Sequence, residues 1–319
     1  MEPIIERLLV SDEASIRFNI CTGVLGEQDH SPGIEALREE IRTSARATEL
    51  LAGRSADGNI AGGVYRKWTG AHWVLSTLAD IGYPAGDNGL APLIDQTCAC
   101  WLSAKHVDAV SVINGRARRC GSQESNALYA MLKLGFIDER ADQLAENLMR
   151  WQWPDGGWNC DKKPSASVSS FHETWIPVRA LALYANLCDH DGAREASARA
   201  ADVFLSRKLF RRLRGGDVIK SHFVQLCYTP YWHYCILNGL KVMVEAGFIK
   251  DNRCEEALDQ LEMKRLDDGG FPAESTYFSA SPSGSSNYSP VKWGVKGPGK
   301  MNEWVTADAL CVLAASGRL

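Results

Sequence analysis

The sequence predicts an all-α fold: a single α/α toroid over residues 1–319, with an inner ring of helices inside an outer ring. Three observations favour this fold. Segments that are apolar on nearly every face alternate with segments whose apolar residues keep to one stripe. The apolar segments end at Gly82, Gly135 and Asp189, at intervals of 53 and 54 residues. No stretch has the apolar–polar alternation that is typical of a strand. About five to six helical hairpins of this size fit the length of the chain.

The elements follow in order along the chain. Residues 1–30 are expected to close the ring with two short helices, roughly 3–10 and 12–24. The repeated hairpins then occupy residues 31–319. Amphipathic outer helices are predicted at 34–53, 91–104, 140–152, 193–210 and 254–265. Inner helices, which begin with polar or aromatic residues, are predicted at 70–84, 122–136, 171–189, 230–248 and 301–319.

The connections between these helices are unequal. Those from an inner to an outer helix are short, whereas those from an outer to an inner helix are long, and long loops in compact domains often carry function. The long loops hold 18 Lys and Arg against 8 Asp and Glu, in a chain whose net charge is −4. They lead into the N-termini of the inner helices, which favour anions. We therefore expect an anionic group to bind at this end, with a merely solvated surface as the alternative.

Composition narrows the classes of partner. The net charge of −4 gives no global reason to expect nucleic acid. No run of 18 apolar residues or basic signal region occurs, so we expect no transmembrane segment; peripheral membrane contact stays open. The ten cysteines are irregularly spaced, which indicates reduced thiols and a cytoplasmic location.

One short motif points to a family. Gln152-Trp-Pro-Asp-Gly-Gly-Trp158 closes an outer helix, and Leu266-Asp-Asp-Gly-Gly-Phe271 and Arg54-Ser-Ala-Asp-Gly-Asn59 are weaker copies. It resembles the QW repeat of the squalene–hopene cyclases, within the superfamily of terpenoid cyclases and protein prenyltransferases. The Phe171-His-Glu-Thr-Trp175 segment also resembles the start of an inner helix in that family.

The resemblance implies a toroid and an isoprenoid substrate, with a prenyl diphosphate among the candidates, converted by acid and carbocation chemistry in an aromatic-lined cavity. The chain departs from the family in two respects. It has the length for one barrel where the cyclases have two, and it lacks both the Asp-x-Asp-Asp and the Asp-Asp-x-x-Asp motifs.

Candidate site residues come from the long loops and the first turns of the inner helices. His and Glu are costly to bury unpaired, so a ring of them indicates function rather than packing. The acid is expected to be Glu173 or Asp161, followed by Glu124. The other catalytic candidates are His172 and His233. The substrate-binding candidates are Trp68, His72, Trp73, Trp175, Tyr231, Trp232, Tyr234, Glu303 and Trp304, with Arg119 and Lys67 for an anionic group.

A metal ion is the alternative. The resemblance implies it, because protein prenyltransferases hold zinc through Asp, Cys and His. The candidate ligands here are Cys120, Cys160, Asp161, His172 and His233, for Zn²⁺ or Mg²⁺, and buried inert thiols are the alternative interpretation. The sequence therefore favours a cyclase-like lyase or isomerase. A hydrolase or transferase using the same cavity, or a non-catalytic toroid that binds an isoprenoid or a protein, stays open.

Overall fold

The computed structural model describes residues 2–281 and 287–319, which are mostly helical, so the all-α prediction is confirmed at that level. The chain divides into two compact units, each described by itself below. Unit 1 comprises Met1–Glu49, Ile81–Pro84 and Leu205–Leu319, and unit 2 comprises Leu50–Asp80 and Ala85–Phe204. Within the described ranges, no helix combines the length and the hydropathy that crossing a membrane requires. The toroid stays a prediction.

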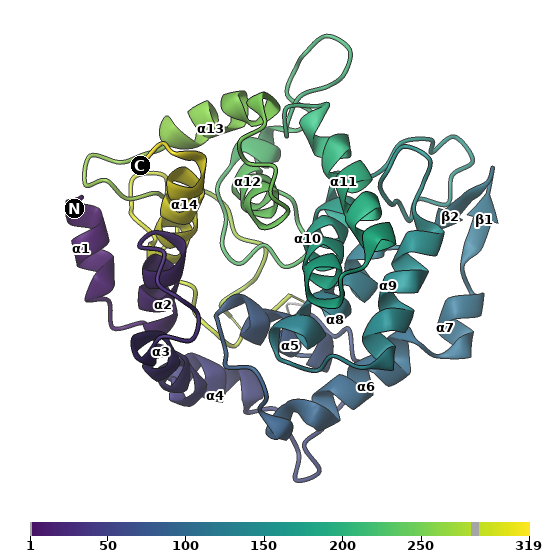
Figure 1. The fold of residues 1–319 in the computed structure, drawn as a ribbon, viewed down its shortest axis with the longest axis horizontal. Coiled ribbons are helices and arrows are strands. Elements are labelled where there is room, and N and C mark those ends of the chain that lie inside the picture. The colour runs from purple at the N-terminus through teal and green to yellow at the C-terminus, as the bar shows by residue number, and fades with distance from the viewer. Residues whose placement is uncertain (1, 282–286) are drawn as a thin grey trace. The chain divides into compact units, whose positions relative to one another are not determined.

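Unit 1 contains helices from both ends of the chain. Helix α14 packs against α2 and α12, so the C-terminal helix lies beside an N-terminal one (Figure 1). The helices that lie wholly or mainly in this unit are α1 (Pro3–Leu9), α2 (Ala14–Gly23), α3 (Pro32–Thr43), α4 (Ala45–Leu51), η2 (Ser221–Val224), α12 (Ile236–Glu245), η3 (Asn252–Cys254), α13 (Glu255–Glu262) and α14 (Glu303–Ser316).

Unit 2 is organised around α8, which packs against α5, α6, α9 and α10 (Figure 1). The α8–α10 contact is the most extensive between helices of this unit. Its elements are α5 (Ala71–Asp80), η1 (Asn88–Leu90), α6 (Ala91–Trp101), α7 (Ala104–Asp108), β1 (Ser111–Ile113), β2 (Arg116–Arg118), α8 (Gly121–Lys133), α9 (Glu139–Trp151), α10 (Phe171–Cys188) and α11 (Asp191–Leu205).

The predicted inner helices end as expected. Gly82, Gly135, Gly247 and Gly317 have φ near +80°, and Asp189 has φ +47°, so each helix stops at a left-handed residue. Two predictions of extent were wrong. The outer segment 34–53 is broken at Ser44, which has extended backbone and caps α4 through its hydroxyl group. Residues 230–235 precede α12, because Tyr231 has φ +52° and Cys235 is extended.

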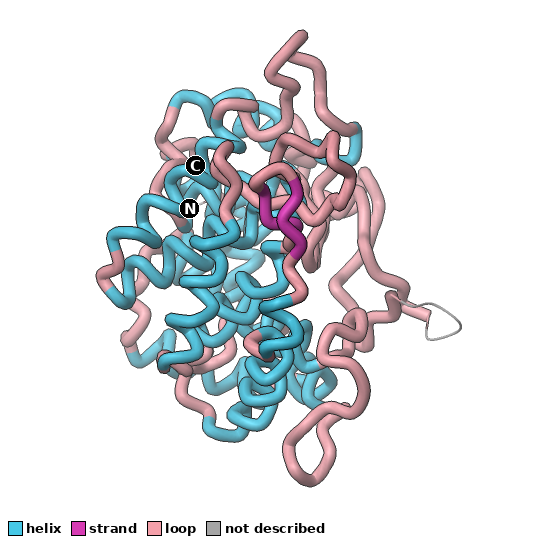
Figure 2. The backbone as a smooth tube through the Cα atoms, turned by 90° about the vertical axis from the view of Figure 1, so that its right-hand side faces the viewer, coloured by secondary structure: helices cyan, strands magenta, loops and turns pink. Residues whose placement is uncertain are grey.

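The described residues also include a β-hairpin, which the sequence analysis did not predict (Figure 2). Strands β1 and β2 pair antiparallel, with Val112 opposite Ala117. The turn between them is Asn114-Gly115, and both residues have positive φ, +52° and +70°. Asn-Gly is the sequence that favours a two-residue hairpin turn. This hairpin leads directly to Arg119, Cys120 and the start of α8.

The QW-like motif follows α9, as predicted, and builds a tight turn there. The Gln152 amide donates to the carbonyl oxygens of Gly156 and Ala196, at 2.7 and 2.8 Å. The buried Trp158 indole donates to the Leu148 carbonyl oxygen at 3.0 Å. A Cβ at Gly156 would lie 2.3 Å from the Arg199 carbonyl oxygen, so only glycine permits this approach. The turn fixes the point from which the chain continues to Cys160.

A buried arginine joins three helices behind the site. Arg179 of α10 is 4% exposed and its guanidinium group donates to Asp80 of α5 at 2.8 Å. It also donates to the Tyr129 hydroxyl group of α8 at 2.5 Å and lies 3.8 Å from that ring. These contacts hold α5, α8 and α10 in one arrangement, and the first turns of all three helices contribute to the site.

Candidate functional site

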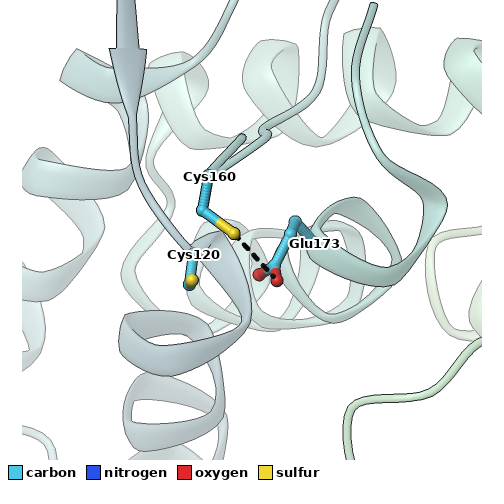
Figure 3. A group of neighbouring side chains, drawn as sticks. All are labelled: Cys120, Cys160 and Glu173. Carbon is cyan, nitrogen blue, oxygen red and sulfur yellow. Dashed lines mark hydrogen bonds between the residues drawn. The ribbon is translucent and has the colours of Figure 1, made fainter. Parts of the chain in front are cut away.

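Two cysteines and a glutamate from three separate segments of unit 2 meet in space. Cys120 is the N-cap residue of α8, Cys160 lies in the loop after the QW-like turn, and Glu173 is in the first turn of α10. Their two sulfur atoms and one carboxylate oxygen all lie within 4.8 Å of one another. Figure 3 shows the three side chains converging, with the Cys160 sulfur directed at the Glu173 carboxyl group.

Glu173 is 8% exposed, and both oxygens of its carboxyl group accept hydrogen bonds. Oε2 accepts from the Ser122 hydroxyl group at 2.7 Å and from the Ser122 backbone N–H at 3.2 Å. Oε1 accepts from the Cys160 thiol at 3.7 Å. Burial raises the Glu173 pKa above 4.5, although the bonds from Ser122 and Cys160 oppose this. The carboxyl group is therefore a titratable group in a largely dry setting.

The two thiols are hydrogen-bond partners. A hydrogen bond between them raises the pKa of Cys120 and lowers that of Cys160, so Cys120 donates and Cys160 accepts. Cys160 is kept beside Cys120 because Arg118, two residues before Cys120, forms a parallel bridge with Asn159, one residue before Cys160. The Asn159 amide donates to the Val168 carbonyl oxygen at 2.9 Å, which holds the loop on the other side.

Gly121 allows the two helix starts to come close. A Cβ at this position would lie 2.8 Å from the Glu173 carbonyl oxygen and 2.8 Å from Cγ of Trp158. Both neighbours are fixed, one by the backbone of α10 and the other by the QW-like turn. Any larger residue would therefore separate Cys120 and Ser122 from Glu173.

A second carboxyl group lies on the same helix. Glu124 is fully buried, and its Oε1 accepts from Arg119 Nε at 2.8 Å and from a second nitrogen of the same guanidinium group. Nε2 of His106, on α7, lies 2.7 Å from the same oxygen. The other oxygen, Oε2, is buried and has no hydrogen-bond partner among the described residues. One carboxylate oxygen thus has three hydrogen-bonding contacts, and the other has no partner within the described part of the chain.

A buried histidine extends this network. The Trp101 indole donates to Nδ1 of His72 at 3.1 Å, so the neutral imidazole carries its proton on Nε2. Burial lowers the His72 pKa to about 3, which keeps the ring neutral. Nε2 has no hydrogen-bond partner in the part of the chain that the structure describes. The centroid of the Trp101 ring also lies 4.8 Å from that of His106, so Trp101 contacts both His72 and His106.

Tyr65 connects the two clusters. Its ring lies 5.3 Å from His72 and 5.0 Å from Trp73, centroid to centroid. Burial raises its pKa, and the charges of Glu173, Cys120 and Cys160 add to this effect. Trp68 packs edge-on against Trp73 at 4.7 Å, and Lys67 lies 5.4 Å from the Trp68 ring. The polar groups therefore adjoin a cluster of packed aromatic rings in unit 2.

The remaining candidates of unit 2 are placed differently. Asp161 is exposed, and its carboxylate accepts from the Lys163 backbone N–H at 2.9 Å in a local turn. His172 is half-buried and lies outside the group formed by Cys120, Cys160 and Glu173. Trp175 is buried in the first turn of α10. Adjacency in sequence to Cys160 and Glu173 thus brings neither Asp161 nor His172 into that group.

The other candidates belong to unit 1 and form an aromatic set of their own. His233 is stacked between Trp232 and Tyr277, at 3.9 and 3.7 Å. The buried Tyr234 hydroxyl group donates to the Leu209 carbonyl oxygen at 2.6 Å, and Tyr231 donates to Ser289 at 3.2 Å. Two further candidates lie at the start of α14: Trp304, stacked on Tyr228 at 4.9 Å, and Glu303, which accepts from Ser11 at 3.0 Å.

Sequence reasoning missed four residues of the site: Tyr65, Trp101, His106 and Ser122. Ser122 and His106 could have been predicted from the sequence, because both lie in or beside the long segment that enters α8. Tyr65 and Trp101 gave no separate signal, since their roles depend on tertiary contacts. In comparisons with known proteins, no protein-family model and no curated protein matches this chain.

Proposed function

We propose that the chain is an acid–base enzyme acting on an apolar substrate of isoprenoid type, with Glu124 as the residue that exchanges a proton with the substrate. The observation that carries the proposal is the asymmetry of this buried carboxyl group. Arg119 and His106 engage Oε1, whereas Oε2 has no partner among the described residues. A buried oxygen without a partner is costly unless a ligand supplies one.

The proposed reaction is a proton transfer at Oε2. The protonated carboxyl group gives its proton to a carbon of a substrate double bond, whose π electrons form the new C–H bond. A cation remains on the neighbouring carbon. Loss of a proton from an adjacent carbon to Oε2 then forms a new double bond and restores the carboxylic acid. The Arg119 and His106 contacts keep Oε1 fixed during both steps.

The aromatic cluster supports the choice of an apolar substrate. The faces of Tyr65, Trp68 and Trp73 attract cationic carbon by cation–π interaction. Lys67 beside Trp68 suits a diphosphate group on the same substrate. The resemblance of the QW-like motif to cyclases points to the same substrate class. With it we propose the remaining expectations: an α/α toroid with an aromatic-lined cavity, and a cytoplasmic protein with no nucleic-acid partner.

The test is incubation of the full chain with prenyl diphosphates of several lengths, followed by product analysis by mass spectrometry. Glu124→Gln keeps the shape of the side chain and removes the exchangeable proton. We expect turnover to fall by about 10²- to 10⁴-fold, the usual contribution of general acid–base catalysis. Glu139→Gln, at the exposed start of α9, is the matched control and should leave turnover unchanged. Equal turnover of Glu124→Gln and wild type, or no product from wild type, would refute the proposal.

A further inference from the structure

We infer that Cys120, Cys160 and Glu173 form a binding site for one zinc ion. This inference goes beyond the proposed function and does not depend on it, because Glu124 is not among the ligands. The group brings two sulfur atoms and one carboxylate oxygen within 4.8 Å of one another. Thiolate and carboxylate ligands of this kind suit Zn²⁺, whereas Mg²⁺ and Ca²⁺ prefer all-oxygen sites.

The spacing of the ligands fits the ion. With Zn–S bonds of about 2.3 Å and Zn–O bonds of about 2.0 Å, tetrahedral geometry separates sulfur from oxygen by about 3.5 Å and two sulfurs by about 3.8 Å. The Cys160 sulfur lies 3.7 Å from Oε1 of Glu173. The third ligand atom, Sγ of Cys120, lies within the same 4.8 Å sphere. An ion placed among the ligand atoms of the three side chains drawn in Figure 3 therefore needs only small movements of these side chains.

The surroundings fix the ligands in the way that metal sites require. Ser122 donates twice to Oε2 of Glu173, which leaves Oε1 for the ion. Outer-shell bonds of this kind orient a ligating carboxylate. The bridge between Arg118 and Asn159 and the close approach at Gly121 hold the backbone of both cysteines next to α10. The ligands come from α8, α10 and the loop between α9 and α10, all packed within one unit.

Charge also favours a cation at this position. When zinc displaces the thiol protons, two thiolates and a carboxylate carry three negative charges, with Cys120 half-buried and Glu173 buried. Arg119 interacts electrostatically with Cys120, but its guanidinium group is already bonded to Glu124. Zn²⁺ would neutralise most of the remaining charge. Three protein ligands leave a fourth position open, as in zinc sites that bind water or substrate.

The experiment uses the purified full chain under reducing conditions. The protein is freed of metal with a chelator, exposed to zinc chloride, desalted and analysed for zinc by elemental mass spectrometry. We expect one zinc per chain, and a thiolate-to-metal charge-transfer band when cobalt replaces zinc. Cys120→Ser and Cys160→Ser should lose the zinc and the band, whereas Cys188→Ser, an exposed thiol of α10, should retain both.

Two further measurements do not require the ligand variants to fold. Zinc should protect Cys120 and Cys160 of the wild-type chain from alkylation, read by peptide mass spectrometry, and should leave Cys188 reactive. Ser122→Ala should weaken zinc binding by about 10- to 100-fold, as loss of an outer-shell partner does. Glu124→Gln should bind zinc normally, which separates this proposal from the proposed function. Three results would overturn the zinc proposal: no bound zinc, protection of other cysteines, or a Cys120–Cys160 disulfide under reducing conditions.

Discussion

Replacement of Glu173 by glutamine should leave the metal-free protein stable and abolish its stabilisation by zinc. The glutamine oxygen can accept both bonds from Ser122, which join Oε2 at 2.7 and 3.2 Å. Only the weak contact from Cys160 at 3.7 Å is lost or reversed. A single neutral hydrogen bond contributes about 0.5–1.5 kcal/mol, and removal of a buried carboxylate offsets this cost. The net change in the free energy of unfolding should be within about 1 kcal/mol.

The pH dependence of the metal-free protein follows from the raised Glu173 pKa. Between the unfolded and folded pKa values, the native state binds more protons than the unfolded state at this group. The wild type therefore loses stability relative to Glu173→Gln as pH rises from about 4.5 through the folded pKa. The stability difference between the two proteins should be constant above the folded pKa.

Zinc adds stability by binding the native state alone. A free concentration 100 times the dissociation constant stabilises by about 2.7 kcal/mol. The measurement is denaturant unfolding of wild type and Glu173→Gln, with and without zinc and across pH. It gives the change in the free energy of unfolding, its pH dependence and the stabilisation by zinc. Equal stabilisation of Glu173→Gln and wild type by zinc would refute the assigned ligand. Loss of more than about 3 kcal/mol in the metal-free variant would show instead that Glu173 serves as a structural charge.

Two further predictions concern the packing behind the site. Gly121→Ala should weaken zinc binding and lower the free energy of unfolding, because overpacking costs about 1–3 kcal/mol and helix propensity returns at most about 1 kcal/mol. Gly63→Ala is the control for Gly121→Ala, since a Cβ at position 63 has nothing within 4 Å. Equal effects of the two substitutions would contradict the predicted steric clash at Gly121. Arg179→Ala should cost about 3–5 kcal/mol, because it empties a buried position and removes the partner of the half-buried Asp80, whereas Tyr129→Phe should cost about 1 kcal/mol. Denaturant unfolding measures both costs, and similar values for Arg179→Ala and Tyr129→Phe would argue against a structural role of the Arg179–Asp80 ion pair.

The sequence predicted the helices well because their signals are local. Apolar patterning located α5, α8, α10 and α14 to within a few residues, and the helix ends at glycine follow from left-handed backbone. The start of α12 was placed too early, because the run Tyr231–Tyr234 is apolar enough to extend the pattern. Only the positive φ of Tyr231, a tertiary outcome, ends it. The Asn114-Gly115 pair is a local signal for the β1–β2 hairpin turn.

The site was predicted only in part. Glu173, Cys120 and Cys160 were identified because their types and positions suggested chemistry, but their meeting depends on the packing of α8 on α10. Asp161 was expected near the site because it lies in the segment that leaves the QW-like turn, but its exposed carboxylate accepts from the Lys163 backbone N–H instead. The hydrogen-bond partners of Glu124 also could not be predicted, because they depend on tertiary contacts. His106 reaches it from α7, across a hairpin whose geometry no periodicity describes.

The most direct measurement of the central claim, that the starts of α8 and α10 assemble a chemical site, is a crystal structure of the zinc-treated chain with anomalous data at the zinc edge. We predict one strong peak about 2.3 Å from the sulfur atoms of Cys120 and Cys160 and about 2.0 Å from Oε1 of Glu173. A peak at another group of residues, or no peak with these three side chains in the positions described, would contradict the account.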